Sequence, residues 1–247
     1  MTGMRVDILT LFPDSMRTVL GESIIGRAAK KGILDIQAHQ IRDYTENKQM
    51  QVDDYPYGGG MGMIMQAQPI YDCFEALFGN LEQKPHVIYM SPKGKTFNQK
   101  RACELAEKEH IVLLCGHYEG IDERVLEEIV DEEISIGDYV LTGGEMAAVV
   151  VTDAVSRMLP GVLSDDICFQ DESHFAGLLE YPQYTRPAEW RGKKVPDVLL
   201  SGHHANIEKW RREQAILTTY NKRPEMLNDA NLTQKEKEFI QSLNKNN

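Results

Sequence analysis

The sequence predicts an α/β fold with a mainly parallel sheet, followed by a small helical C-terminal domain. Through the first 160 residues, short apolar runs rich in β-branched residues alternate with segments in which apolar residues recur at helical spacing. Strands that alternate with helices are typical of a parallel sheet, because each helix carries the chain back to begin the next strand. After residue 176, two further segments have helical spacing.

The expected elements follow in order along the chain. Residues 6–11 predict a first strand that ends before Pro13, and residues 16–31 predict one helix closed by Gly32. Further strands are expected at residues 33–38, 86–90, 111–115 and 134–136. Further helices are expected at residues 70–78, 99–108, 122–130, 145–159, 205–220 and 233–243, with Pro69 in the first turn of the helix at 70–78.

The chain divides into two predicted domains joined by a linker. Residues 1–160 form the α/β domain, residues 161–176 show little periodicity and form the linker, and residues 177–247 form the helical domain. No stretch approaches the roughly 20 apolar residues of a membrane span, and the N-terminus lacks the pattern of a signal peptide. The scattered cysteines do not predict a zinc site or a disulfide framework. We therefore expect a cytoplasmic protein that binds no membrane.

The net charge of −11 disfavours a nucleic-acid partner, but the charge is unevenly distributed. Residues 176–247 carry 12 Lys and Arg against 9 Asp and Glu, a net charge of +3, whereas residues 1–175 carry 15 against 29, a net charge of −14. In the basic part, arginines interleave with aromatics at residues 181–194 and 210–213. Such side chains suit RNA phosphates and unstacked bases. The alternative is a solvated surface over ordinary core aromatics.

Three glycine-containing segments follow predicted strands: SPKGK at 91–95, GHYEGIDER at 116–124 and SIGDYVLTGGE at 135–145. Ligands of open α/β sheets bind outside the carboxyl ends of the strands, and glycine lets backbone amides approach a ligand closely. Any one of these segments could be only a turn, but three together favour a site. Neither a P-loop nor a G-x-G-x-x-G motif is present, so we expect a ligand without phosphates. The available carboxylates are Glu119, Asp122 and Asp138.

Two other features allow more than one interpretation. DDYPYGGGMGM, at residues 53–63, contains three consecutive glycines and predicts either a flexible linker or a lid that contacts substrate. The histidines, including the adjacent His203 and His204, form no metal-ligand pattern, so no metal site is predicted.

At these motifs the sequence resembles the TrmD family, bacterial tRNA (guanine-N1)-methyltransferases of the SPOUT class. The resemblance runs nearly end to end and includes VDDYPYGGG, YEGIDER, DEEISIGDYVLTGGE, SRMLPGVL, GLLEYPQYTRP and VPDVLLSG. It implies methyl transfer from S-adenosylmethionine to N1 of the guanosine immediately 3′ of the anticodon. It also implies a deep trefoil knot in the N-terminal domain, which periodicity would not suggest. Members of the family act as homodimers with active sites at the subunit interface, and their C-terminal domain binds the tRNA.

The resemblance implies that the three post-strand segments hold S-adenosylmethionine. The expected cofactor contacts are Tyr89, Met90, Ser91 and Pro92 from the first segment, Gly116, Tyr118, Glu119 and Gly120 from the second, and Ser135, Ile136, Gly137, Asp138, Tyr139, Val140, Leu141, Gly143 and Gly144 from the third. The family is associated with magnesium, but no ligand cluster in the sequence identifies a site for it.

The expected catalytic residues are Arg157, Glu172 and Asp171. Arg157 matches the family's catalytic arginine and would stabilise negative charge on guanine O6. The family's general base is an Asp directly before a Ser, but here QDESHF places Glu172 before Ser173, with Asp171 one residue earlier. We expect Glu172 to remove the N1 proton, and Asp171 is the alternative. Smaller departures are Met61, His117 and Thr142, where the family often has Pro, Arg and Ser.

Two rival functions remain open from the sequence. A SPOUT enzyme of this kind could instead methylate ribose or a different base. A knotted RNA-binding module without activity is the second rival, although the carboxylates and Arg157 argue against it.

Overall fold

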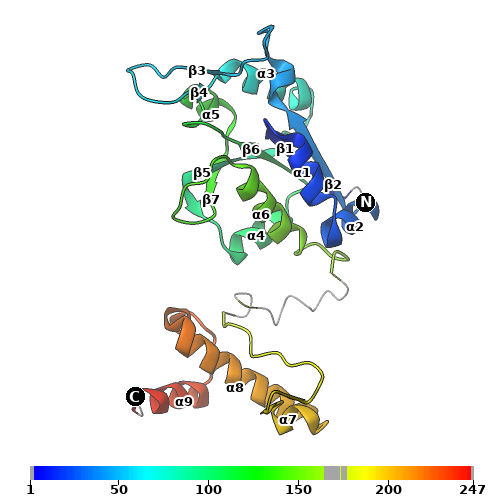
Figure 1. The fold of residues 1–247 in the computed structure, drawn as a ribbon, viewed down its shortest axis with the longest axis vertical. Helices are drawn as coiled ribbons and strands as arrows, with labels where there is room; N and C mark the ends of the chain where they lie inside the picture. The colour runs from blue at the N-terminus through cyan, green and yellow to red at the C-terminus, as the bar shows by residue number, and fades with distance from the viewer. Residues whose placement is uncertain (1–2, 164–172, 174–176, 246–247) are drawn as a thin grey trace. The chain divides into compact units, whose positions relative to one another are not determined.

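In the computed structural model, residues 3–163, 173 and 177–245 are placed well enough to describe (Figure 1). The chain falls into two compact units, Met1–Asp166 and Ile167–Asn247, each described by itself. No helix among the described residues is both long and apolar enough to cross a membrane.

The N-terminal unit contains a five-stranded sheet in the order β2-β1-β6-β5-β7, and all of its strand pairs are parallel. The strands are β1 (Met4–Thr10), β2 (Leu34–Gln40), β5 (His86–Thr96), β6 (His110–Cys115) and β7 (Glu132–Ser135). This confirms the predicted α/β fold with a parallel sheet. In this order β6, β5 and β7 are neighbours, so the segments after these three strands emerge at the same edge of the sheet.

Helices cover both faces of the sheet (Figure 1). One face packs against α1 (Pro13–Leu20), α2 (Ser23–Lys30), α4 (Gln99–Ala106) and α6 (Glu145–Ser156), and the other against α3 (Ala67–Phe78) and α5 (Glu123–Ile129). Strand β6 has apolar side chains on both faces, which is why helices pack on both sides of the sheet. Ile111 and Leu113 face the first core, Val112 and Leu114 face the second, and all four are fully buried. A strand buried on both faces has a continuous apolar sequence, as predicted for this segment.

The prediction of one helix over residues 16–31 is wrong, because the chain breaks into α1 and α2 at Gly21. Gly21 donates its N–H to the Arg17 carbonyl, and Ser23 then takes a positive φ of 54°. The turn brings α2 back onto α1 so closely that a Cβ at Gly26 would lie 1.9 Å from the Gly21 carbonyl oxygen. The break therefore depends on a contact between two glycines.

A buried carboxylate joins three neighbouring strands. Asp7 on β1 is fully buried and bonds to His39 Nε2 on β2 at 2.5 Å, His110 Nε2 on β6 at 2.7 Å and Arg5 Nε at 2.6 Å. Burial alone raises the pKa of Asp7, but the hydrogen bonds from His110, His39 and Arg5 outweigh it and hold that pKa far below its usual value. Asp7 is therefore an ionised structural group.

Strand β5 differs from its prediction because it continues past residue 90. Its pairing with β7 shifts between Met90 and Lys95, so residues 91–94 form a bulge within the strand. A Cβ at Gly94 would lie 2.4 Å from the Glu133 carbonyl carbon of β7, and only glycine permits this approach. The segment SPKGK thus bulges beside β7, with the Ser91 hydroxyl accepting a hydrogen bond from the Lys93 N–H.

The C-terminal unit is mainly helical. It contains α7 (Asp197–Leu200), α8 (His204–Lys222) and α9 (Gln234–Lys245), around a small core of Leu178, Ala215 and Ile216. The predicted helices at 205–220 and 233–243 are confirmed by α8 and α9. The hairpin of β8 (Glu189–Trp190) and β9 (Lys193–Lys194) was not predicted, because its strands are only two residues long. Arg191 and Gly192 turn the hairpin with positive φ angles of 51° and 76°.

Candidate active site

The three predicted loops meet around one cavity of about 240 Å³ at the carboxyl ends of β5, β6 and β7. Every residue predicted to contact the cofactor lines this cavity, except Asp138, which is exposed and lies outside its lining. The lining comprises residues 89–92 from β5 and its bulge, 116 and 118–120 from the second loop, and 135–137, 139–141 and 143–144 from the third. The structure therefore assembles a single site from loops that lie far apart in the sequence.

The floor of the cavity is backbone rather than side chain. Gly144 donates its N–H to the Gly116 carbonyl at 2.8 Å, which joins the third loop to the second. A Cβ at Gly144 would lie 2.9 Å from Cys115 Cα and 3.2 Å from the Gly116 nitrogen. A Cβ at Gly116 would lie 2.9 Å from the Tyr89 hydroxyl oxygen. Both glycines therefore allow the second and third loops to pack closely against β5 and β6 at the cavity.

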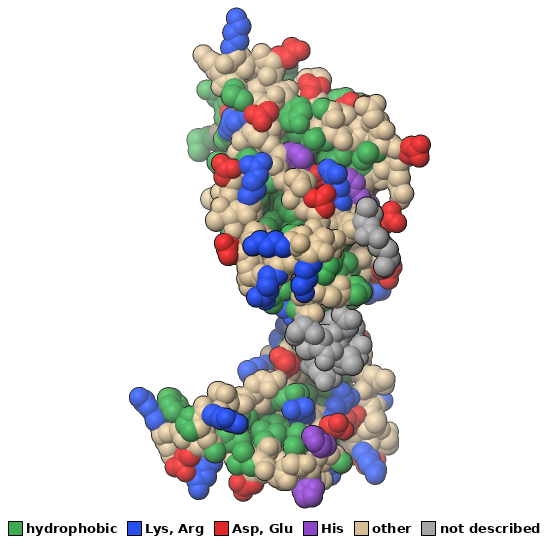
Figure 2. All heavy atoms as spheres, turned by 90° about the vertical axis from the view of Figure 1, so that its right-hand side faces the viewer, with side chains coloured by type: hydrophobic (Ala, Val, Ile, Leu, Met, Phe, Trp, Pro, Cys, Tyr) green, Lys and Arg blue, Asp and Glu red, His purple; other side chains and the backbone are tan. Residues whose placement is uncertain are grey.

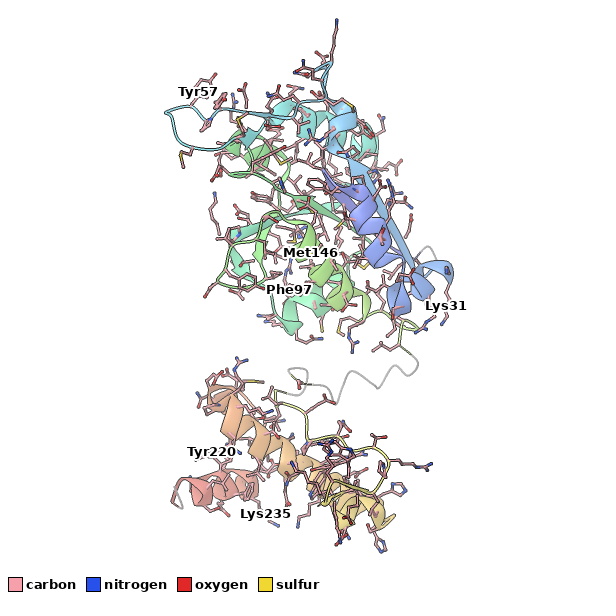
Figure 3. All side chains as sticks on the ribbon, viewed as in Figure 1. Lys31, Tyr57, Phe97, Met146, Tyr220 and Lys235 are labelled. Carbon is pink, nitrogen blue, oxygen red and sulfur yellow. The ribbon has the colours of Figure 1, made fainter. Side chains whose placement is uncertain are left out.

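The second loop is held by the segment that follows the triple glycine. Glu119 donates its N–H to the Met63 carbonyl at 3.0 Å, and Met65 donates its N–H to the Gly120 carbonyl at 2.9 Å. These bonds bring β3 (Asp53–Asp54) and β4 (Ile64–Met65) to the rim of the cavity. The intervening loop leaves the body of the unit, with the fully exposed Tyr57 near its tip (Figure 3). This position suits the predicted lid or substrate-contact loop.

Of the three candidate carboxylates, only Glu119 lines the cavity. Asp122 caps α5 by accepting the Arg124 N–H, and its side chain also pairs with the Arg124 guanidinium at 2.6 Å. The hydrogen bond from the Arg124 side chain lowers the pKa of Asp122. Asp122 thus has a structural role that its position before a predicted helix could have indicated.

The cavity walls carry little fixed positive charge. Of the Lys and Arg residues that the structure describes, only Lys93 lines the cavity. Burial raises the pKa of Tyr89 to about 12 and raises the pKa of the Cys115 thiol well above its usual value, so both groups are neutral near pH 7. Among the described residues, no group of three or more His, Cys, Asp or Glu is arranged to hold a metal ion. The site is suited to an uncharged or cationic ligand without phosphates.

Comparison with known proteins identifies the family. Residues 4–229 match the family described as tRNA (guanine-1)-methyltransferase TrmD. The chain is 62% identical to a tRNA (guanine-N(1)-)-methyltransferase of Ruminiclostridium cellulolyticum, over 91% of this chain and 97% of the relative. It is 54% identical to the enzyme of that name from Alkaliphilus oremlandii, over 97% and 98% of the two chains. The relative from Halalkalibacterium halodurans is 52% identical over 98% of each.

The chain belongs to the TrmD family.

In this TrmD-family chain, Arg157, the one predicted catalytic residue among the described residues, does not line the cavity. Arg157 is the half-buried C-cap residue of α6, whereas Glu145 and the cavity are at the other end of that helix. At a rise of about 1.5 Å per residue, the 12 residues of α6 separate its two ends by roughly 18 Å. Asp171 and Glu172 lie outside the described residues.

The sequence did not single out every residue of the lining. The additional residues are Lys93, His117, Ile121, Leu126, Ile134, Thr142 and Ala147. Most of them adjoin predicted site residues, so their position along the chain could have indicated them. Leu126 and Ala147 belong to α5 and α6 and reach the cavity through the packing of those helices, which has no local sequence signal.

Proposed function

We propose that this chain transfers a methyl group from S-adenosylmethionine to N1 of the guanosine immediately 3′ of the anticodon in tRNA. Membership of the TrmD family and the activity for which the relatives are named support the reaction. The cavity formed by the loops after β5, β6 and β7 is the observation that supports this site. As the family resemblance implies, we also propose that these loops form a deep trefoil knot, and that the enzyme acts in the cytoplasm, where its substrate is found.

The residues of the cavity fit S-adenosylmethionine. Gly116 and Gly144 let the second and third loops pack closely against Tyr89 and Cys115, which brings loop backbone groups to the cavity. Ile134, Leu126 and Leu141 offer apolar surface for an adenine ring, and Glu119 offers a carboxylate for a cationic group. The scarcity of Lys and Arg suits a ligand that carries no phosphate. When bound, the cofactor supplies an electrophilic methyl group on a sulfonium centre.

The protein's own chemical task is to make guanine N1 nucleophilic. N1 carries a proton at neutral pH, and a carboxylate that accepts it raises the electron density available for attack on the methyl group. We assign this role to Glu172, with Asp171 as the alternative. The Arg157 guanidinium would stabilise the negative charge that develops on guanine O6 as the proton leaves. The target base must leave its stack to reach these groups.

The position of Arg157 supports an active site shared by two subunits. Because α6 places Arg157 roughly 18 Å from the cavity end of the helix, we propose that it serves the cavity of the partner subunit. Apolar side chains on the surface near the cavity support a homodimer. Val140 of the third loop is 83% exposed, and Met146 and Val150 of α6 are 50% and 46% exposed. Figure 3 labels Met146 on α6. An exposed apolar patch of this kind is typical of a protein–protein interface.

We propose that residues 177–247 bind the tRNA, that residues 1–160 bind the cofactor, and that residues 161–176 link them. In the C-terminal unit, the Arg191 guanidinium lies 5.0 Å from the centre of the exposed Trp190 ring, and that of Arg211 lies 5.1 Å from the centre of the Tyr181 ring. Lys and Arg side chains are spread among acidic and apolar ones on the face seen in Figure 2. Arginine and aromatic groups together suit phosphates and unstacked bases.

Nucleoside analysis tests the proposal. An unmodified tRNA transcript is incubated with the enzyme and S-adenosylmethionine, digested and examined by mass spectrometry. We expect 1-methylguanosine, and no methylation of a matched transcript in which adenosine replaces the target guanosine. A methyl group on ribose or on another base would establish the first rival function. A failure to bind S-adenosylmethionine by calorimetry would favour an RNA-binding module without activity.

A further inference from the structure

His117 lies where the second loop meets the third. It pairs with Gly143 in an isolated antiparallel bridge, and its carbonyl accepts the Gly120 N–H at 3.1 Å. Its ring packs between Phe12 at 5.2 Å and Tyr118 at 5.0 Å, measured between ring centres. Because His117 also lines the cavity, a shift of its side chain would move the cavity wall.

The imidazole is left with one buried nitrogen that lacks a hydrogen bond. His117 Nδ1 is shielded from solvent and has no hydrogen-bond partner among the described residues. The nearest acidic group is Glu145 at the start of α6, whose Oε2 lies 4.0 Å from Nδ1. The other oxygen, Oε1, already accepts the Thr10 hydroxyl at 2.8 Å. Glu145 is therefore a buried carboxylate with one oxygen still open to a donor.

Gly143 explains why these two groups can meet. A Cβ at Gly143 would lie 2.6 Å from His117 Nδ1 and 2.3 Å from Glu145 Oε2. The imidazole and the carboxylate thus occupy the space that any other residue at position 143 would fill. A small movement of either side chain would turn the 4.0 Å approach into a charge-assisted hydrogen bond across the two loops.

We propose that His117 is a positioning residue of the cofactor site: in its protonated form it pairs with Glu145 and holds the second and third loops in the arrangement that binds S-adenosylmethionine. This inference rests on the proposed cofactor site. Near His117, Glu145 of α6 lies 4.0 Å from Nδ1 and Tyr118 packs against the ring, while Glu119 and Lys93 line the same cavity. Glu145 is the carboxylate within ion-pair distance, so protonation of His117 completes the pair.

The inference predicts pH-dependent cofactor affinity. If binding requires the closed pair, binding favours the protonated imidazole, so affinity is highest at low pH and falls as pH rises. An ordinary histidine titrates near pH 6.5.

Calorimetry with S-adenosylhomocysteine, a stable cofactor analogue, from about pH 5.5 to about pH 8 tests the proposal on the full-length protein. We expect the dissociation constant of the wild type to rise by about threefold to tenfold over this range. His117→Arg, which carries a fixed charge, should keep tight binding with no such rise. His117→Gln and Glu145→Gln should bind weakly at every pH. His204→Gln, which removes an exposed histidine of α8, should behave as the wild type.

Comparison among the variants separates this inference from the proposed function. Titration of the analogue itself affects all of the variants equally, so only differences between them are informative. A wild-type pH dependence that persists in His117→Gln would overturn the role of His117 while leaving the cofactor site intact. Weak binding by both His117→Gln and His117→Arg, with unchanged thermal unfolding, would also overturn it. No binding by the wild type would overturn the proposed cofactor site and this inference together.

Discussion

The substitution Gly144→Ala, which adds a single methyl group, tests whether close backbone packing shapes the proposed cofactor site. Gly144 has φ −76° and ψ −9°, which alanine adopts easily, so Gly144→Ala introduces no backbone strain of its own. The new Cβ, however, would lie 2.9 Å from Cys115 Cα and 3.1 Å from Met90 Cβ. Cys115 Cα belongs to the central strand β6 and cannot yield as a flexible side chain would.

The expected loss of S-adenosylmethionine affinity follows from this geometry. Overpacking by one methyl group in a tight site typically costs about 1–3 kcal/mol of stability. Here the steric strain would be relieved by moving the third loop away from β6. That movement stretches the 2.8 Å bond between the Gly144 N–H and the Gly116 carbonyl and widens the cavity between them. Since about 1.4 kcal/mol corresponds to a factor of ten in affinity, we expect the dissociation constant for S-adenosylmethionine to rise by about fivefold to 140-fold.

Calorimetric titration of Gly144→Ala with S-adenosylmethionine, alongside thermal unfolding, measures the effect. Gly202→Ala is the control, because a Cβ there meets nothing within 4 Å and its φ of 71° adds only local strain outside the N-terminal unit. Affinity within about twofold of the wild type in Gly144→Ala would refute the argument that this contact shapes the site.

Three further predictions concern stability, catalysis and RNA binding. Because the pKa of Asp7 is depressed in the folded state, its contribution to stability is present above its unfolded pKa of about 3.9 and is lost as pH falls below that value. Asp7→Asn should lower the free energy of unfolding at pH 7 by about 3–5 kcal/mol, and denaturant unfolding at several pH values checks both statements. Glu172→Gln should slow single-turnover methyl transfer by about 10²–10⁴-fold with little change in cofactor affinity, and Asp171→Asn should cost far less; the opposite ranking moves the role to Asp171. A chain ending at Leu163 should retain S-adenosylmethionine binding and lose tRNA binding in a filter assay, and undiminished tRNA affinity would contradict the assignment to residues 177–247.

Much of the site could be predicted because its signals are local. A buried strand such as β6 has a continuous apolar sequence, and the glycine-containing segments directly follow the strands. The resemblance implied that a set of loop residues holds the cofactor, and all of them except Asp138 line one cavity. Asp138 is the exception, because whether its side chain turns inward depends on the fold of the third loop and not on its neighbours in sequence.

The features that the sequence did not reveal depend on contacts between distant residues. The break between α1 and α2 requires Gly26 to approach Gly21, and the bulge in β5 requires Gly94 to approach the backbone of Glu133. Periodicity detects the faces of elements but not such approaches. The sequence showed His117 only as a departure from the family. Its approach to Glu145 beside Gly143 forms only in the folded chain and has no local sequence signal.

A crystal structure with S-adenosylhomocysteine bound tests the central claim most directly, namely that the loops after β5, β6 and β7 form the cofactor site. We predict density for the analogue in the cavity between Tyr89, Gly116 and Gly144, with hydrogen bonds to loop backbone groups. Such a structure would also show whether Arg157 of the partner subunit reaches the same cavity. Density for the analogue at another place, with this cavity filled only by water, would contradict the account.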